Sequence, residues 1–224
     1  MRRLSAVLAL CVAVSAACGG SSSDTTLPDV EGLLRDSAAA MTALRYAGFE
    51  MTTEGAPVTI EGLTFRAAEG AYAAPDSARG ILTMQALGIT VDLATISVGE
   101  RTWLTSPLTG RWEELRAGTG FNPAIFFGPE GWAPLLTEDM SDAVVTGVSG
   151  GEYVVTGRVA EHRVEFLTAG IATDQDVAID LHIDAETLHL THAEFTTVGD
   201  EGTTDWEIDL FDFDEPVTIE PPTP

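Results

Sequence analysis

Apolar and polar residues alternate along most of this chain, and this alternation restricts the fold more than any other feature of the sequence. Clear examples are residues 47–51 and 63–67, in which every second residue is apolar. A period of two places successive side chains on opposite faces of a β-strand, so one face packs on a core while the other meets water. The chain is therefore predicted to form half-buried strands joined by turns.

The same pattern recurs along the chain as far as residue 213. Gly88 and Gly99-Glu100 are turn signals, and Ser149-Gly150-Gly151 marks a hairpin. Antiparallel hairpins are the simplest way to join strands so close in sequence. The predicted strands are residues 47–52, 63–68, 82–86, 89–93, 143–148, 152–159, 176–183, 187–196 and 203–213.

A few segments depart from this pattern and are predicted to be helical. Between Asp29 and Arg45 apolar residues recur three or four positions apart, and Asp29 is a good N-cap after Pro28. Residues 160–169 show a weaker helical period, and residues 135–140 are compatible with a short helical turn. The sequence therefore contains few helices to cover a large sheet.

Residues 106–134 form a long segment that is rich in Gly and Pro and also in aromatic side chains. Long segments without regular structure usually have a function or cover an apolar surface. We therefore interpret this segment as a lid or an entrance rim. The rim residues predicted from it are Phe121, Ile125, Phe126 and Trp132.

The first residues of the chain form an export signal. Arg2-Arg3 precede a mainly apolar run over residues 4–17, and Cys18 follows. This run is too short to span a bilayer as a mature helix and is typical of a signal peptide. Cleavage before Cys18 would expose a cysteine for diacylglycerol, as in bacterial lipoproteins, although Ser15 stands where Leu is usual. The alternative is plain secretion after an Ala-x-Ala site.

The cysteines also limit how the fold can be stabilised. Cys11 and Cys18 are the only two, and Cys11 lies inside the predicted signal. The mature chain therefore has no intramolecular disulfide, and its fold depends on a buried core. The predicted organisation is a signal peptide at 1–17, a lipidated cysteine with a flexible tether at 18–27, one domain at 28–216, and a disordered tail at 217–224.

The charge of the chain excludes some partners. The formal net charge is −24 and no lysine is present, and loss of Arg2 and Arg3 with the signal makes it more negative still. Such a surface repels nucleic acid and gains nothing from anionic lipid headgroups. We therefore predict an exported protein held on the outer face of the plasma membrane by acyl chains, including palmitate, at Cys18.

One serine motif suggests catalysis, but its context favours a turn. Gly147, Ser149 and Gly151 fit the pattern of a hydrolase nucleophile elbow, which requires a strand before the serine and a helix after it. Residues 152–156 read as a second strand instead. The glycines are therefore interpreted as hairpin residues, and no enzyme activity is predicted.

Neither the histidines nor the acidic C-terminal strand predicts a metal site. His189 and His192 would point to opposite faces of a strand, and zinc requires converging ligands. The carboxylates of residues 205–214 alternate along a strand and lack the glycine-containing turn of a calcium loop. The four histidines, interpreted as solvated or hydrogen-bonded, are His162, His182, His189 and His192.

Several segments, taken together, resemble a known family. The chain is similar to the LppX/LprAFG family of actinobacterial cell-envelope lipoproteins in the order and spacing of these motifs, over nearly the whole of residues 28–216. The segments that carry the resemblance are residues 33–44, FEMTTEG at 49–55, VGERTWLTSPLTGRW at 98–112, FNPAIFFGPEGWAPLL at 121–136 and IDAETL at 183–188.

The resemblance implies an α+β fold, in which a single curved antiparallel sheet, or half-barrel, carries a few helices on its concave face and encloses an apolar cavity. It also implies binding of acylated lipid or glycolipid and its carriage between envelope layers, without catalysis or cofactor, with an envelope lipid transporter as a possible partner. The cavity wall is then assigned to Phe49, Met51, Phe65, Leu82, Met84, Ile89, Val91, Leu93, Ile179 and Leu181.

The residues alone leave an alternative open. The same apolar strand faces are ordinary core in most sheet proteins, and their pattern does not separate a filled core from a lipid cavity. With a closed core, the chain is a structural or interaction lipoprotein that docks an envelope partner through its acidic face.

Overall fold

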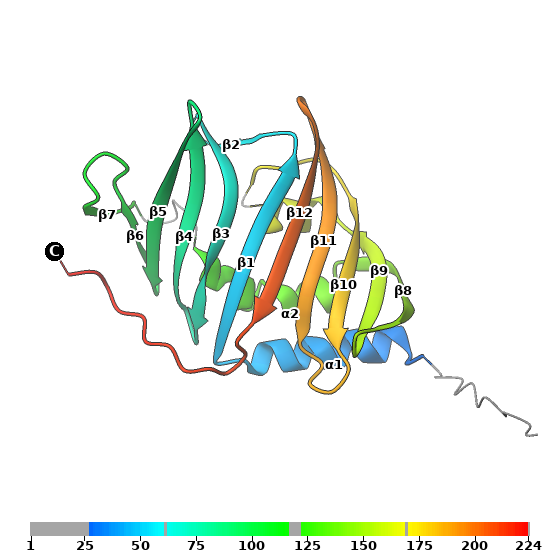
Figure 1. Ribbon diagram of the computed structural model, residues 1–224. Coiled ribbons are helices and arrows are strands. Elements are labelled where there is room, and N and C mark those ends of the chain that lie inside the picture. The colour runs from blue at the N-terminus through cyan, green and yellow to red at the C-terminus, as the bar shows by residue number, and fades with distance from the viewer. Residues whose placement is uncertain (1–26, 61, 117–121, 169, 224) are drawn as a thin grey trace, which may run out of the picture.

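One antiparallel sheet of twelve strands forms most of the molecule (Figure 1). The computed structural model describes residues 27–223 except 61, 117–121 and 169. The strands are β1 (Tyr46–Gly55), β2 (Val58–Ile60), β3 (Leu63–Ala73), β4 (Ser77–Ala86), β5 (Ile89–Val98), β6 (Arg101–Thr105), β7 (Trp112–Glu114), β8 (Met140–Ser149), β9 (Glu152–Val159), β10 (Val177–Asp184), β11 (Leu190–Gly199) and β12 (Gly202–Phe211).

The strand order is β7-β6-β5-β4-β3-β1-β12-β11-β10-β9-β8, and β2 pairs with β3. Strands adjacent in sequence pair on each side, as predicted for hairpins. The two halves meet where β1 pairs with β12, with Phe49 opposite Leu210. The first and last strands therefore lie side by side in the middle of the sheet, and residues far apart in sequence share one surface.

Three short α-helices and one 3-10 helix lie on one face of this sheet (Figure 1). We call this face the inner face and the opposite one the outer face. Helix α1 begins after Asp29, whose carboxylate accepts a hydrogen bond of 2.9 Å from the Gly32 amide. The elements are α1 (Val30–Ala43), η1 (Pro123–Phe127), α2 (Trp132–Thr137) and α3 (Glu161–Leu167).

The predicted single antiparallel sheet is present, but the chain is mostly β rather than α+β, because its helices are so short. The helices predicted at 29–45 and 160–169 correspond to α1 and α3. The short turn predicted at 135–140 begins earlier, at Trp132. Strands β2, β6 and β7 were not predicted, because segments of three to five residues are too short to show a clear alternating pattern.

The alternation that predicted the strands also separates the two faces. In β12 the side chains of Trp206, Ile208 and Leu210 are buried, whereas the acidic residues between them are exposed. In this strand the buried side chains face the helices, and the Asp and Glu side chains lie on the outer face. The hydrophobic core therefore lies between the sheet and the helical layer.

The two outermost strands leave the sheet open at its edges. Strand β7 has three residues, and β8 has ten. The pairing of β8 with β9 is interrupted twice, between Ser141 and Val144 and between Val145 and Gly147. Asp142, inside the first interruption, has a φ of 52°. Strand β8 is therefore bent by bulges rather than straight.

A buried ion pair fixes α3 to the segment after α2. The guanidinium of Arg163 donates from Nε to Asp139 Oδ2 at 2.9 Å and from Nη1 to the Glu130 carbonyl. The Arg163 side chain is 8% exposed and that of Asp139 is 16% exposed. Since each charge is largely withdrawn from water, each depends on the other for its counter-charge.

Removing one partner of this pair tests its structural role. Asp139→Ala leaves the Arg163 guanidinium buried without its carboxylate, so we expect the free energy of unfolding to fall by about 3–5 kcal/mol. The control, Asp36→Ala, removes a pair with Arg35 whose side chains are 71% and 56% exposed. It should change the free energy by less than about 1 kcal/mol. Urea unfolding measures both, and equal effects would contradict a buried anchor.

Candidate functional site

The inner face of the central strands is a broad apolar surface. Antiparallel pairing aligns its inward side chains in rows that run across the sheet, and most of these side chains are apolar. Such a surface stabilises the fold only when something covers it. Three successive rows are Leu210, Phe49, Gly70, Gly80 and Thr95, then Ile208, Met51, Ala68, Leu82 and Leu93, then Val58, Phe65, Met84 and Val91.

Glycine at position 70 leaves room for the aromatic ring of Phe49. A Cβ at Gly70 would lie 2.1 Å from the carbonyl oxygen of Arg79 and 2.7 Å from Cζ of Phe49. No side chain fits in that space, so the Phe49 ring occupies it. The first row is therefore filled by a side chain from the next strand.

Aromatic rings attach η1 to the sheet and to the other helices. The ring of Phe127 stacks on Tyr72 of β3, with centroids 4.6 Å apart and an interplanar angle of 11°. Phe126 contacts Phe166 of α3 edge to face at 5.6 Å. Burial raises the pKa of Tyr72, so its phenol stays neutral beneath the Phe127 ring. These contacts hold the cover in place without any covalent link.

Two small cavities lie beneath the helical cover. One cavity under η1 has a volume of about 10 Å³. A second cavity, between α1 and η1, is equally small. A space of that size is about enough for one water molecule. The first is lined by Phe49, Met51, Phe126, Phe127, Trp132, Ile208 and Leu210.

Most residues predicted as cavity wall lie on the inner face. Leu82 and Val91 are half-buried, whereas Ile89 is 66% exposed at the start of β5. Ile89 follows the same alternation as Val91, but it lies beyond the covered part of the sheet. The wall residues that are buried are Phe49, Met51, Phe65, Met84, Leu93, Ile179 and Leu181.

The residues predicted as the rim lie mainly inside the helical layer. Phe126 and Trp132 are buried, with 5% and 2% exposure, and Ile125 is 39% exposed. Phe121 lies outside the described residues. At these three positions the aromatic segment is therefore part of the cover on the core, rather than an exposed edge around an opening.

Trp132 has a feature that was not predicted from the sequence. Its indole Nε1 is buried and has no hydrogen-bond partner in the described part of the chain. The other fully buried tryptophan, Trp206, donates from Nε1 to Thr197 Oγ1 at 2.9 Å. Trp132 also lines both small cavities under the cover. An unpaired buried donor costs about 1–3 kcal/mol, which a polar ligand atom or a water would recover.

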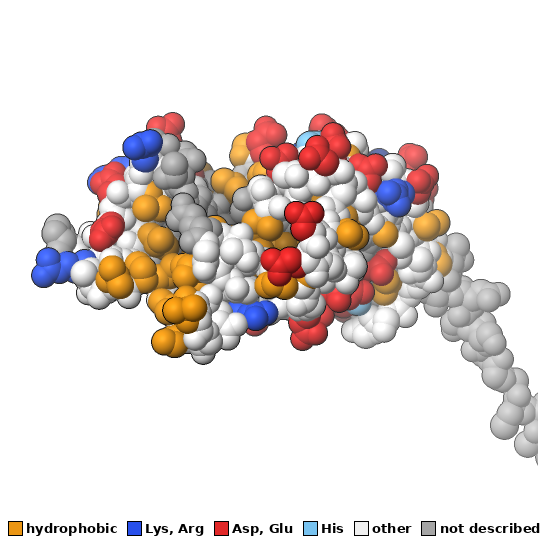
Figure 2. Space-filling model, turned by 90° about the horizontal axis from the view of Figure 1, so that it is seen from above, with side chains coloured by type: hydrophobic (Ala, Val, Ile, Leu, Met, Phe, Trp, Pro, Cys, Tyr) orange, Lys and Arg blue, Asp and Glu red, His pale blue; other side chains and the backbone are white. Residues whose placement is uncertain are grey.

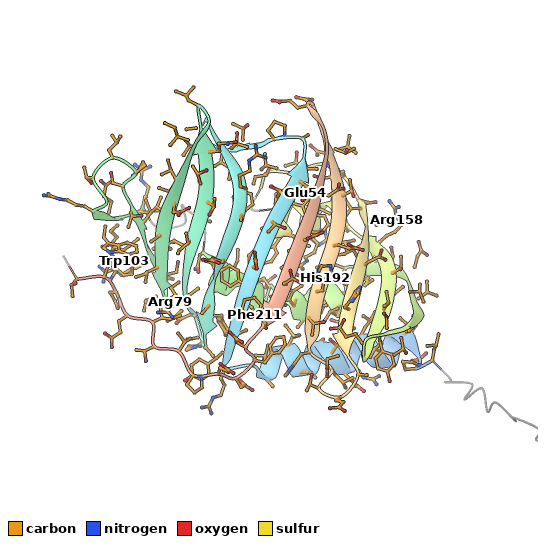
Figure 3. All side chains as sticks on the ribbon, viewed as in Figure 1. Glu54, Arg79, Trp103, Arg158, His192 and Phe211 are labelled. Carbon is orange, nitrogen blue, oxygen red and sulfur yellow. The ribbon has the colours of Figure 1, made fainter. Side chains whose placement is uncertain are left out.

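The outer face carries a wider hollow of about 730 Å³. Its floor includes Gly48, Arg79 and Ile96, and the segment after β12 passes over it, with Glu215 and Val217 in its wall (Figure 3). The structure thus gives Val217 a place against the sheet, and residues 218–223 have no regular secondary structure. The disorder predicted for 217–224 stays a prediction.

The other sequence motifs occupy ordinary structural positions. Ser149 ends β8 at a hairpin with β9, so no helix follows it as a nucleophile elbow requires. His182 contacts Glu152 at 3.0 Å, and His192 contacts Asp209 at 2.8 Å. Each of these rings thus has its own carboxylate. Among the described residues, no group of three or more His, Cys, Asp or Glu is arranged to hold a metal ion.

Comparison with known proteins assigns this architecture. The model of the LppX_LprAFG lipoprotein family matches residues 29–219. The chain belongs to this family. The match covers the whole sheet and its helical cover, and the family resemblance found in the sequence is confirmed. A search of curated proteins finds no match.

Two crystal structures share the family fold. One is lipoprotein LppX from Mycobacterium tuberculosis, with a TM-score of 0.61 and 17% identity, covering 85% of this chain and 98% of that one. The other is LprF from Mycobacterium bovis, with a TM-score of 0.62 and 16% identity, covering 88% and 99%. At this identity the likeness shows the fold alone.

Membership of a lipoprotein family implies an exported, membrane-anchored protein. The predicted anchor, Cys18, and the predicted signal peptide at 1–17 lie outside the described residues, as does most of the tether at 18–27. Within the residues that the structure does describe, no helix is long and apolar enough to cross a bilayer. The lipid on Cys18 stays a prediction.

Substitution of Gly70 tests the close contact beneath Phe49. Gly70→Ala places a methyl group against the Arg79 carbonyl, so we expect the free energy of unfolding to fall by about 1–3 kcal/mol. Gly147→Ala is the matched control, because a Cβ there meets nothing within 4 Å. It should be neutral or stabilising by up to about 1 kcal/mol. Thermal or urea unfolding compares them, and a neutral Gly70→Ala would contradict the tight packing.

Proposed function

We propose that this protein is a membrane-anchored, non-catalytic lipoprotein that binds the acyl chains of a lipid or glycolipid on the inner face of its sheet and carries the lipid between envelope layers. Family membership and the shared LppX and LprF fold support this proposal. In it, the sheet is a half-barrel whose apolar cavity opens when the helical cover moves.

The observation that carries the proposal is an apolar inner face that is larger than its cover. The side chains of Leu82 and Val91 in the second and third rows are only half-buried, as are Leu63 and Leu104 beside them. In a core sealed by packing, side chains of this kind are normally fully buried. Acyl chains bound there would bury the apolar surface that the helical cover leaves exposed, and this burial would stabilise the complex.

The small cavities indicate where the cover must move. A volume of about 10 Å³ under η1 cannot hold an acyl chain, so binding there requires η1 and α2 to separate from β1 and β12. Such a movement also breaks the ring contact between Phe127 of η1 and Tyr72 of β3. Trp132 would then offer its unpaired N–H to an ester carbonyl of the lipid.

The same small cavities favour a second candidate function. If the helical cover never opens, the protein is a structural lipoprotein with a closed core, and its acidic outer face docks an envelope partner. Binding to such a partner weakens at high salt, because exposed charges are screened. The two candidates differ in whether lipid is present in the purified protein.

Bound lipid and its location test the leading proposal. We expect mass spectrometry of protein purified without detergent to show acylated lipid, and Val91→Trp to reduce it strongly, because the indole fills the inner face. The control is Ile96→Trp on the same strand, which lines the outer hollow. A parent protein without lipid would overturn the proposal. Loss of lipid from the Ile96→Trp variant alone would indicate that the lipid binds in the outer hollow instead.

The anchor has a separate test. Cys18→Ala removes the only attachment site for acyl chains, so we expect the protein to pass from the membrane fraction to the soluble fraction. Fractionation followed by immunoblotting measures this, with Cys11→Ala as the matched control that should remain in the membrane. A Cys18→Ala protein that stays with the membrane would show that the anchor is elsewhere.

A further inference from the structure

The hairpin that joins β4 to β5 has an unusual tip. Leu87 and Gly88 form a two-residue turn with φ values of 50° and 81°. Such turns favour Asn, Asp or Gly at both positions, since other side chains disfavour a positive φ. The Leu87 side chain is fully exposed, with a relative accessibility of 103%. Folding alone therefore gives no reason for a leucine at this position.

Three other two-residue hairpin turns lie within the described residues, and each begins with Gly or Asp rather than with a large apolar residue. They are Gly99-Glu100, Gly150-Gly151 and Asp200-Glu201. The last of these joins β11 and β12 and lies at the same end of the sheet as the β4–β5 tip (Figure 1). One end of the molecule thus carries an acidic, well-hydrated tip and an apolar tip.

The part of the β4–β5 hairpin nearest its tip contains no charged residue. Residues 80–91 contain no Asp, Glu, Lys or Arg, in a chain of which 21% of the residues are charged. Seen from above, hydrophobic side chains gather on the side of β4 and β5, while most of the acidic side chains lie over the other half of the molecule (Figure 2). This hairpin therefore lacks the charges that would oppose contact with a lipid surface.

An apolar row connects the tip with the inner face. Ile60 pairs with Leu63, and Ala86 pairs with Ile89. Because Thr64 pairs with Gln85, Leu63 and Ala86 are also neighbours. Each of these four residues lies two positions along its strand from a third-row residue. Because side chains two positions apart point to the same face of a sheet, all four lie on the inner side. We call Ile60, Leu63, Ala86 and Ile89 the end row.

The end row continues the proposed lipid site to the end of the sheet. It lies directly beyond the third row, in which Phe65 and Met84 are 5% and 4% exposed. Ile60 is 38% exposed and Ile89 is 66% exposed. The inner face thus runs without a polar interruption from the buried core to an exposed apolar edge beside Leu87.

We propose that the β4–β5 tip inserts into a zwitterionic lipid surface, and that the end row is the path by which acyl chains pass between that surface and the inner face. The second part rests on the proposed lipid-binding function, whereas the first does not. The partner is a bilayer because family membership places the protein at a membrane and the tip offers apolar side chains without charge. An anionic surface would be repelled by the rest of the domain.

Quenching of a fluorophore by spin-labelled lipid tests the insertion. The lipoprotein, reconstituted in phosphatidylcholine vesicles, is labelled with a nitrobenzoxadiazole dye at Leu87→Cys or at Leu108→Cys. Leu108 is the matched control because it is 93% exposed in the loop between β6 and β7. Apolar segments of this kind bury to a depth of about 5–10 Å, so lipid carrying a shallow nitroxide should quench most emission at 87 and little at 108.

The results separate this proposal from the proposed function. Equal quenching at the two positions, or none at 87, overturns the insertion, even if mass spectrometry finds bound lipid. Quenching at 87 in a protein that carries no lipid supports the insertion and overturns the lipid-carrying function. Replacing part of the phosphatidylcholine with phosphatidylglycerol should reduce the quenching at 87, and an increase would contradict the zwitterionic preference.

A second variant separates a membrane contact from a structural role. Leu87→Asn puts a residue preferred by this turn in place of leucine, so the unfolding temperature should stay the same or rise. Transfer of lipid from vesicles to the protein should nevertheless slow by about tenfold, because the variant no longer buries a leucine side chain in the lipid surface. Leu108→Asn should leave the transfer unchanged. A slower transfer in both variants, or in neither, would contradict the role of the tip.

Discussion

The need to cover one apolar face of an open sheet is the constraint on which the rest of the structure depends. In a closed barrel the sheet would cover this face itself. Here the edge strands β7 and β8 do not pair, so the helices must cover the face instead. Helices as short as α2 and α3 are not stable alone in water. Side-chain contacts hold them: Arg163 of α3 pairs with Asp139, and Trp132 of α2 and Phe166 of α3 both lie against Phe126 of η1. The neighbouring ring of η1, Phe127, stacks on Tyr72 of the sheet.

This arrangement divides the molecule into surfaces of opposite chemistry. Along β12, Trp206 and Ile208 point inward while Asp205 and Glu207 point outward. On β4 and β5 the outer side is less acidic, because Ile81 and Ile96 line the outer hollow there. The acidic face keeps the domain hydrated and away from anionic headgroups. The apolar face reaches solvent mainly at the β4–β5 end. A protein held near a membrane by its N-terminus would thus have one end suited to touching lipid and a face suited to receiving it.

The sequence predicted the parts of this fold that depend on local periodicity. Residues 47–51 and 203–213 alternate clearly, and both form strands with the expected inward side chains. It did not predict that these two strands pair, because that contact joins opposite ends of the domain. Ile89 is exposed and the nearby Val91 is half-buried because the helical cover ends between them. The alternation within a strand carries no information about where that cover ends. Trp132 was predicted as a rim residue and is buried. Its burial depends on contacts with other aromatic rings, such as that of Phe126, which the sequence does not reveal.

The bulged edge of the sheet has a consequence for how many copies can share a membrane. An unpaired edge strand is a template on which a second molecule can add its own strand, and anchoring concentrates copies in two dimensions. The two interruptions in β8 and the left-handed Asp142 bend that strand away from a straight ladder, while β7 is too short to offer one. The open sheet is thus protected at both ends against growth into fibres, and crowded copies can stay separate.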